Sequence, residues 1–80
     1  MNTAATLHPI AQRKVAELLL RAFNETRPAR SRAYRQGVKA KLDQYFAVAR
    51  IACPYAEGSA ELDAFFAGVD EGQAIVRSLA

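Results

Sequence analysis

Apolar residues recur at helical spacing in three stretches of the chain, and the first stretch follows Pro9. Its apolar positions lie three or four residues apart and most charged residues fall between them, which is typical of an amphipathic helix. The spacing predicts a helix over residues 9–24, with Pro9 in its first turn, Thr6 or His8 as the N-cap and Asn24 at its end. Its expected core-facing residues are Ala11, Val15, Leu18, Leu19, Ala22 and Phe23.

The second stretch follows Pro28, which blocks direct continuation of the first helix. Thr26 or Ser31 is the expected N-cap, with Pro28 in the first turn. We expect this helix to end at Cys53, because the residue before Pro54 is disfavoured in helical geometry. Its expected apolar face consists of Tyr34, Val38, Leu42, Tyr45, Phe46, Ala49 and Ala52 or Cys53.

The third stretch follows Gly58 and begins with Ser59, a favourable N-cap. Glu61 and Asp63 come directly after it, where acidic side chains interact favourably with the positive end of the helix dipole. The expected apolar face consists of Leu62, Phe65, Phe66, Val69, Val76 and Leu79.

Small residues recur every four positions beside that face; they are Ala60, Ala64, Gly68 and Gly72. Two glycines inside one helix weaken it by about 2 kcal/mol in total, so a compensating contact is expected. Ala33 and Gly37 in the second helix offer a matching small surface, and we expect the two helices to cross closely there. No sustained alternation of apolar and polar residues indicates strands. The sequence therefore predicts an all-α fold of three helices.

Length and composition place this fold in a single small domain. The chain has 80 residues, of which 51% are hydrophobic and 24% charged. Cys53 is the only cysteine and His8 the only histidine, so an internal disulfide is impossible and a metal site is not expected. The longest run of large apolar residues, 18–20, is far too short to span a bilayer. With no targeting segment visible, we expect a cytoplasmic protein without metal, cofactor or membrane contact.

Charge is distributed unevenly along the chain, whose formal net charge is +3. Residues 13–41 contain nine basic residues and two acidic ones, a net charge of +7. Residues 42–80 contain two basic residues and six acidic ones, a net charge of −4. A basic half joined to an acidic half can dock on an anionic surface through its basic side. Alternatively, the two halves can pair with each other, within one chain or in a homodimer.

Residues that could carry catalysis are few. Cys53 lies at the expected C-terminal end of a helix, where the dipole opposes thiolate formation, so we interpret Cys53, Pro54 and Tyr55 as a packed turn. His8 is interpreted as a residue flanking the first helix. Asp63 and Asp70 share a helix face, but acids in such positions are ordinary. No nucleophile–base pair can be assembled, and the sequence favours a protein that is not an enzyme.

The best binding candidate is a cluster of arginines around Tyr34. Arginine side chains match phosphate geometry, and a tyrosine ring can stack on an unpaired base. Alternatively, these arginines solvate the start of the second helix and meet the acids of the third. The candidate nucleic-acid-binding residues are Arg27, Arg30, Arg32, Arg35, Lys39 and Lys41.

The residue order from Tyr34 to Gly72 resembles the ribosome modulation factor family and its phage- and plasmid-borne relatives. The resemblance rests on residues 34–40 (Tyr-Arg-Gln-Gly-Val-Lys-Ala), on Cys-Pro-Tyr at 53–55, and on the aromatic–glycine–glutamate pattern that follows. It implies a helical hairpin over residues 29–80 around a Cys-Pro-Tyr loop, preceded by a helix and linker over 1–28. The structural residues that it implies are Gly37, Cys53, Pro54, Tyr55, Phe65, Gly68, Glu71 and Gly72.

Two functions follow from these observations. The resemblance implies a basic protein that binds the small ribosomal subunit near the end of its rRNA and regulates translation. The first function is therefore a non-enzymatic regulator that binds RNA or the ribosome through a basic helix face. The second is a phage or mobile-element protein that inhibits a host complex, for example a CRISPR complex, by protein–protein binding.

Overall fold

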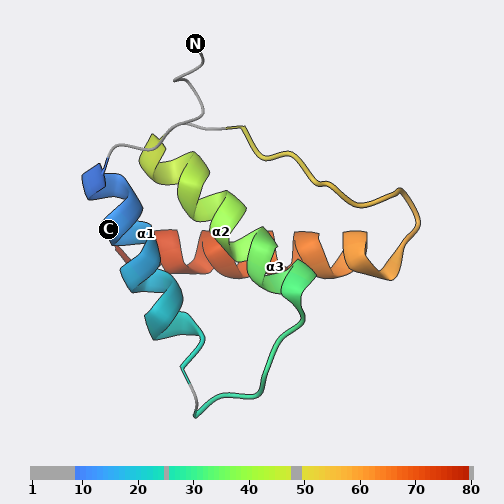
Figure 1. The fold of residues 1–80 in the computed structure, drawn as a ribbon, viewed down its shortest axis with the longest axis horizontal. Coiled ribbons are helices and arrows are strands. Elements are labelled where there is room, and N and C mark those ends of the chain that lie inside the picture. The colour runs from blue at the N-terminus through green and yellow to red at the C-terminus, as the bar shows by residue number, and fades with distance from the viewer. Residues whose placement is uncertain (1–8, 25, 48–49, 80) are drawn as a thin grey trace.

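Three helices account for most of the chain in the computed structural model, which describes residues 9–24, 26–47 and 50–79 (Figure 1). They are α1 (Pro9–Ala22), α2 (Arg32–Ala47) and α3 (Ala60–Ser78). No strand occurs in the described ranges, so the predicted all-α fold of three helices is confirmed. Within the same ranges, none of the helices is both long enough and apolar enough to cross a bilayer.

The first helix follows its prediction closely. It begins at Pro9, and the Phe23 amide still donates to the Leu19 carbonyl at 2.9 Å after the last helical residue. The side chain of Asn24 then donates to the Arg21 carbonyl at 3.2 Å and ends the helix as expected. The two proposed N-caps, Thr6 and His8, lie outside the described residues.

The second helix begins later than Pro28. The Ser31 hydroxyl accepts a hydrogen bond from the Tyr34 amide at 3.1 Å, so Ser31 is the N-cap and Pro28 lies outside the helix. The first-turn position expected for Pro28 is therefore wrong. Thr26 does not cap this helix either, because its amide donates to the side chain of Asn24 at 2.8 Å in a tight turn after α1.

The second helix also ends earlier than expected, at Ala47 and not at Cys53. The reason is the position of Tyr55, whose hydroxyl donates to the side chain of Gln36 near the start of α2. Eleven helical residues separate Gln36 from Ala47, a rise of about 16 Å, and eight extended residues can span that distance. A helix continued to Cys53 would leave two residues to return about 26 Å.

The described part of the segment between α2 and α3 therefore contains residues 50–53, which were expected to extend the second helix. Ala52 is exposed there and Cys53 is half-buried, and neither is helical. Ala49 lies outside the described residues. Figure 1 shows the returning segment in gold, passing from the end of α2 to the start of α3.

The third helix begins as the sequence predicts. The Ser59 hydroxyl accepts from the Leu62 amide at 3.1 Å, and both Glu61 and Asp63 lie in the first turn. Before it, Gly58 has a φ of 81°, a conformation that glycine adopts without steric cost, and it turns the chain into the helix.

The small residues of α2 and α3 bring the two backbones into direct contact. A Cβ atom built on Gly68 would lie 2.0 Å from the Tyr34 carbonyl oxygen, and one built on Gly37 would lie 1.8 Å from the Phe65 carbonyl oxygen. A Cβ on Gly72 would lie 2.6 Å from the Cβ of Lys41. The predicted close crossing is confirmed, and it holds α3 behind α2 in the view of Figure 1.

The core lies where the helices face one another. Val15 and Leu18 from α1 pack with Val38 and Leu42 from α2. Phe65 from α3 is also buried, beside the crossing. Ile75 and Val76, in the last part of α3, cover the same cluster.

Three large residues expected on apolar faces are exposed in the structure. Phe66 is 43% exposed because it lies on the side of α3 opposite Gly68 and hence faces away from α2. Leu79 is 38% exposed at the C-cap of α3. Tyr45 is 51% exposed in the last turn of α2, where its ring packs edge-on against Phe46.

Candidate functional site

Arg27 makes an ion pair that joins three parts of the fold. Its guanidinium donates to both carboxylate oxygens of Glu71 on α3, at 2.8 and 3.2 Å. The same guanidinium donates to the carbonyl of Ala22, the last residue of α1, at 2.6 Å. The hydroxyl of Tyr34 on α2 completes the arrangement by donating to Glu71 at 2.5 Å. We call Arg27, Tyr34 and Glu71 the Glu71 cluster.

The Glu71 cluster shifts the ionisation of its members. Hydrogen bonds from the Arg27 guanidinium lower the pKa of Glu71 against an opposing effect of burial, and the Tyr34 hydroxyl lowers it further. Burial raises the pKa of Tyr34, and its hydrogen bond to the carboxylate adds to that rise. All three groups are therefore held in their ordinary charge states near neutral pH. Of the two interpretations of the arginines, the one in which they pair with acids of the third helix is confirmed for Arg27.

Four other candidate cations form a separate surface, which we call the basic stripe: Arg30, Arg32, Arg35 and Lys39. Residues 32, 35 and 39 are three and four apart and so lie on one exposed face of α2. Among the described residues, the only carboxylate that forms an ion pair with the stripe is that of Asp43, 2.8 Å from the Lys39 amine. The three arginine charges of the stripe are therefore not neutralised by an ion pair within the described chain.

Contacts within the stripe order two of its arginines. The Arg30 guanidinium lies over the Tyr34 ring, 4.6 Å from its centroid. Arg35 donates to the backbone carbonyl of Arg30 at 2.6 Å. These contacts fix the linker before α2 while both arginine side chains stay exposed to solvent.

Lys41, the sixth candidate, lies on the opposite side of α2 from the stripe. Its stem packs over Gly72 at the helix crossing, and its amine donates to the side chain of Gln44 at 2.7 Å. A helix advances 100° per residue, so Lys41 is half a turn away from Arg32. The structure therefore brings four of the six predicted residues together. It pairs Arg27 with Glu71 beside them and places Lys41 on the other side of α2.

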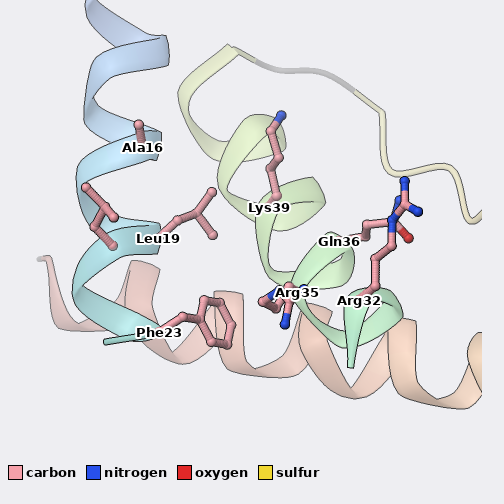
Figure 2. Close-up of a pocket in the computed structure, with 8 residues that line it drawn as sticks. Ala16, Leu19, Phe23, Arg32, Arg35, Gln36 and Lys39 are labelled. Carbon is pink, nitrogen blue, oxygen red and sulfur yellow. The ribbon is translucent and has the colours of Figure 1, made fainter. Parts of the chain in front are cut away.

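A groove of about 580 Å³ runs between α1 and α2 beside the basic stripe (Figure 2). Its α1 wall is apolar and its α2 wall carries polar and charged groups. The lining residues are Ala16, Leu19, Leu20 and Phe23 from α1, and Arg32, Arg35, Gln36 and Lys39 from α2. A second hollow of about 540 Å³ adjoins the groove at the linker and shares Phe23 and Arg35 with it.

Sequence reasoning missed this groove. It assigned Leu19 and Phe23 to the core and gave no role to Leu20, which is 76% exposed. The available signal was a second stripe on the first helix, since residues 16, 19, 20 and 23 have the spacing of a continuous helical face.

Two residues of the Cys-Pro-Tyr motif, Cys53 and Tyr55, are half-buried, whereas Pro54 is exposed. Tyr55 lies edge-on to Phe65 with ring centroids 6.3 Å apart, and its hydroxyl reaches Gln36. The Cys53 thiol is half-buried and approaches the Tyr55 carbonyl at 4.0 Å. In the described part of the chain, no three histidine, cysteine or acidic side chains gather as a set of metal ligands.

No family model matches this sequence, and neither a curated protein nor a solved structure matches it significantly. The function must therefore be argued from the geometry of the site. The residues behind the resemblance have clear positions: Gly37, Gly68 and Gly72 at the helix crossing, Phe65 in the core and Glu71 in its cluster.

Proposed function

We propose that this chain is a non-enzymatic RNA-binding protein that docks through the basic stripe. The observation that carries the proposal is the gathering of four exposed cations at one surface, three of them arginines outside any ion pair in the described chain. Arginine forks bind phosphate oxygens in two-point contacts, and cations spaced along a helix can follow a phosphate backbone.

The positions of two acidic residues also favour docking of RNA at the basic stripe. Asp63 and Asp70 are exposed on the side of α3 that faces away from α2, because the opposite side contains Gly68 and Gly72 at the crossing. The basic stripe and these two carboxylates thus lie on different elements and face different ways. An anionic polymer would be attracted to the stripe more than to the far side of α3, where Arg77 lies in line with the two aspartates.

The ribosome is the first target to test, because the resemblance in residues 34–72 is to ribosome modulation factors. The triple variant Arg30→Ala, Arg32→Ala and Arg35→Ala should lose binding to purified small ribosomal subunits in co-sedimentation. The matched control is Arg21→Ala, Arg50→Ala and Arg77→Ala, which removes the same charge from exposed positions outside the stripe. The control should retain most of its binding.

Salt dependence gives the second measurement. Each phosphate contact to a single strand contributes about 0.7 to the slope of log K against log salt concentration, so the triple variant should flatten that slope by about 2. Circular dichroism should show both variants folded, because exposed arginines contribute little to stability. Unchanged affinity and slope in the triple variant would contradict the proposal.

A further inference from the structure

The groove between α1 and α2 has an apolar wall that the proposed RNA contact does not use. Leu20 stands at this wall with 76% of its surface exposed, and Leu19 and Phe23 lie beside it partly buried. A single exposed leucine is ordinary on a protein surface. Here it belongs to a continuous apolar strip within a groove, which is the arrangement of a binding site.

The length of the groove suits two turns of a helix. On each wall the lining residues follow the spacing i, i+3, i+4 and i+7, so each wall is one continuous helical face. α1 and α2 run side by side in opposite directions in Figure 1, and Figure 2 shows Leu19 reaching toward α2. The lining extends over eight residues on each helix, a rise of about 10 Å, which matches two turns of a bound helix.

The two walls differ in charge, and this difference defines the ligand. One wall is apolar, whereas the other presents Arg32, Arg35 and Lys39. A complementary helix has one apolar strip flanked on one side by carboxylates at spacings of three and four residues. We propose that the groove binds an acidic amphipathic helix of a partner protein.

The composition of the apolar wall favours a peptide over nucleic acid. Bases bind to single-strand sites by stacking on aromatic rings, and Phe23 is the only ring on this wall. That ring already has the Arg27 guanidinium 5.0 Å from its centroid and the Tyr34 ring packed edge-on. The rest of the wall is aliphatic, which suits leucine or isoleucine side chains of a helical ligand.

This inference does not rest on RNA binding. The groove contains Leu20, which is not in the basic stripe, and the stripe contains Arg30, which does not line the groove. Both ligands would use Arg32, Arg35 and Lys39, so an acidic helix should compete with RNA for the protein.

The test uses a fluorescent peptide of about 16 residues, with leucines at i, i+4 and i+7 and glutamates on one flank of that strip, titrated with the full chain. The peptide should bind, and Leu20→Glu should weaken it at least about tenfold through a buried charge and repulsion. The control Leu79→Glu makes the same change at an exposed leucine outside the groove and should bind within about twofold. A peptide with the glutamates replaced by lysines should not bind the natural chain.

Charge reversal distinguishes the groove from unspecific attraction. Arg35→Glu should weaken the glutamate peptide and improve binding of the lysine peptide. Leu20→Gln removes the apolar side chain without adding a charge, so it should weaken the peptide while ribosome binding stays near that of the natural chain, which separates this inference from the RNA proposal. The inference is overturned if the glutamate peptide does not bind the natural chain, or if Leu20→Glu binds that peptide as well as Leu79→Glu does. It is also overturned if Leu20→Glu reduces RNA binding and leaves peptide binding unchanged. A last contrary outcome concerns self-association. If the natural chain self-associates in sedimentation, Leu20→Glu abolishes this and the peptide does not bind, the groove belongs to a second copy of the chain and the inference is overturned.

Discussion

Glu71 is the residue through which the linker, α2 and α3 are joined by polar contacts. Its carboxylate accepts hydrogen bonds from Arg27 and Tyr34, and Arg27 also reaches the end of α1. Hydrogen bonds to a charged group are stronger than those between neutral groups, and losing one partner leaves the others unsatisfied. We therefore expect substitutions at Glu71 to affect stability more than those at the exposed acids of α3.

Glu71→Gln should lower the free energy of unfolding by about 1–2 kcal/mol at pH 7, because it removes the charge from these hydrogen bonds. The folded-state pKa of Glu71 lies below its ordinary value of 4.5. The contribution of its ionisation is therefore fully present above pH 4.5 and is lost as the pH falls through the folded-state value. Urea denaturation of both proteins between about pH 3 and pH 7 should show their stabilities converging at the acidic end.

Asp70→Asn is the matched control, because it removes an exposed charge one residue earlier on the far side of α3. Its free energy of unfolding should stay within about 0.5 kcal/mol of that of the natural chain at pH 7. A difference between Glu71→Gln and the natural chain that persisted unchanged at pH 3 would contradict the assigned role of the carboxylate.

At the scale of elements, most helix boundaries set by neighbouring residues were predictable, whereas the one set by a distant contact was not. Pro9 and Ser59 begin α1 and α3 as expected because an N-terminus is specified by the few residues beside it. The end of α2 is set by a distant contact, the hydrogen bond of Tyr55 to Gln36, which requires the chain to turn back early. Nothing in the local sequence near Ala47 contains that information.

The crossing of α2 and α3 was predictable because glycines inside helices are costly. Gly37, Gly68 and Gly72 offered an unusually small surface on each of two helices, and the contact between those surfaces compensates for the lost helix propensity. Phe65 is buried beside the crossing because its backbone lies directly against Gly37. The exposure of Phe66 and Leu79 did not follow, since the apolar pattern alone could not show which side of α3 the other helices cover.

Gly68→Leu should destabilise the domain despite improving local helix propensity. Removing the glycine returns about 1 kcal/mol, whereas overpacking a close contact typically costs about 1–3 kcal/mol. Here the added Cβ would meet the Tyr34 carbonyl at 2.0 Å, and a backbone atom cannot move aside as a flexible side chain could. The overpacking cost should therefore reach the upper end of its range, and we expect a net loss of about 2 kcal/mol in urea denaturation.

Ala67→Leu is the neighbouring control, because Ala67 is exposed on the other side of the same helix. Its stability should stay within about 0.5 kcal/mol of that of the natural chain. If Gly68→Leu raised the melting temperature, the close approach of the two backbones would be wrong.

On the scale of the whole molecule, the position of the candidate site was only partly predictable. The charge pattern identified the basic half, and four of its six candidate residues form the basic stripe. Assigning Arg27 to the Glu71 cluster and Lys41 to the far face of α2 required the relative placement of all three helices. The groove was missed for the same reason, since it exists only where α1 lies beside α2.

The Glu71 cluster has a further consequence for the cooperativity of the fold. α2 and α3 share a far more extensive contact than α1 and α2 do, and α1 makes no comparable backbone contact with α3 among the described residues. Besides the packing of Val15 and Leu18 against α2, the Arg27 guanidinium links the end of α1 to Glu71 on α3 through the Ala22 carbonyl. We expect native-state amide exchange to show α1 opening as a separate low-energy unit while α2 and α3 stay protected together. In Glu71→Gln the exchange of α1 amides should quicken more than that of amides at the glycine crossing, and uniform acceleration of all three helices would indicate a single cooperative unit instead.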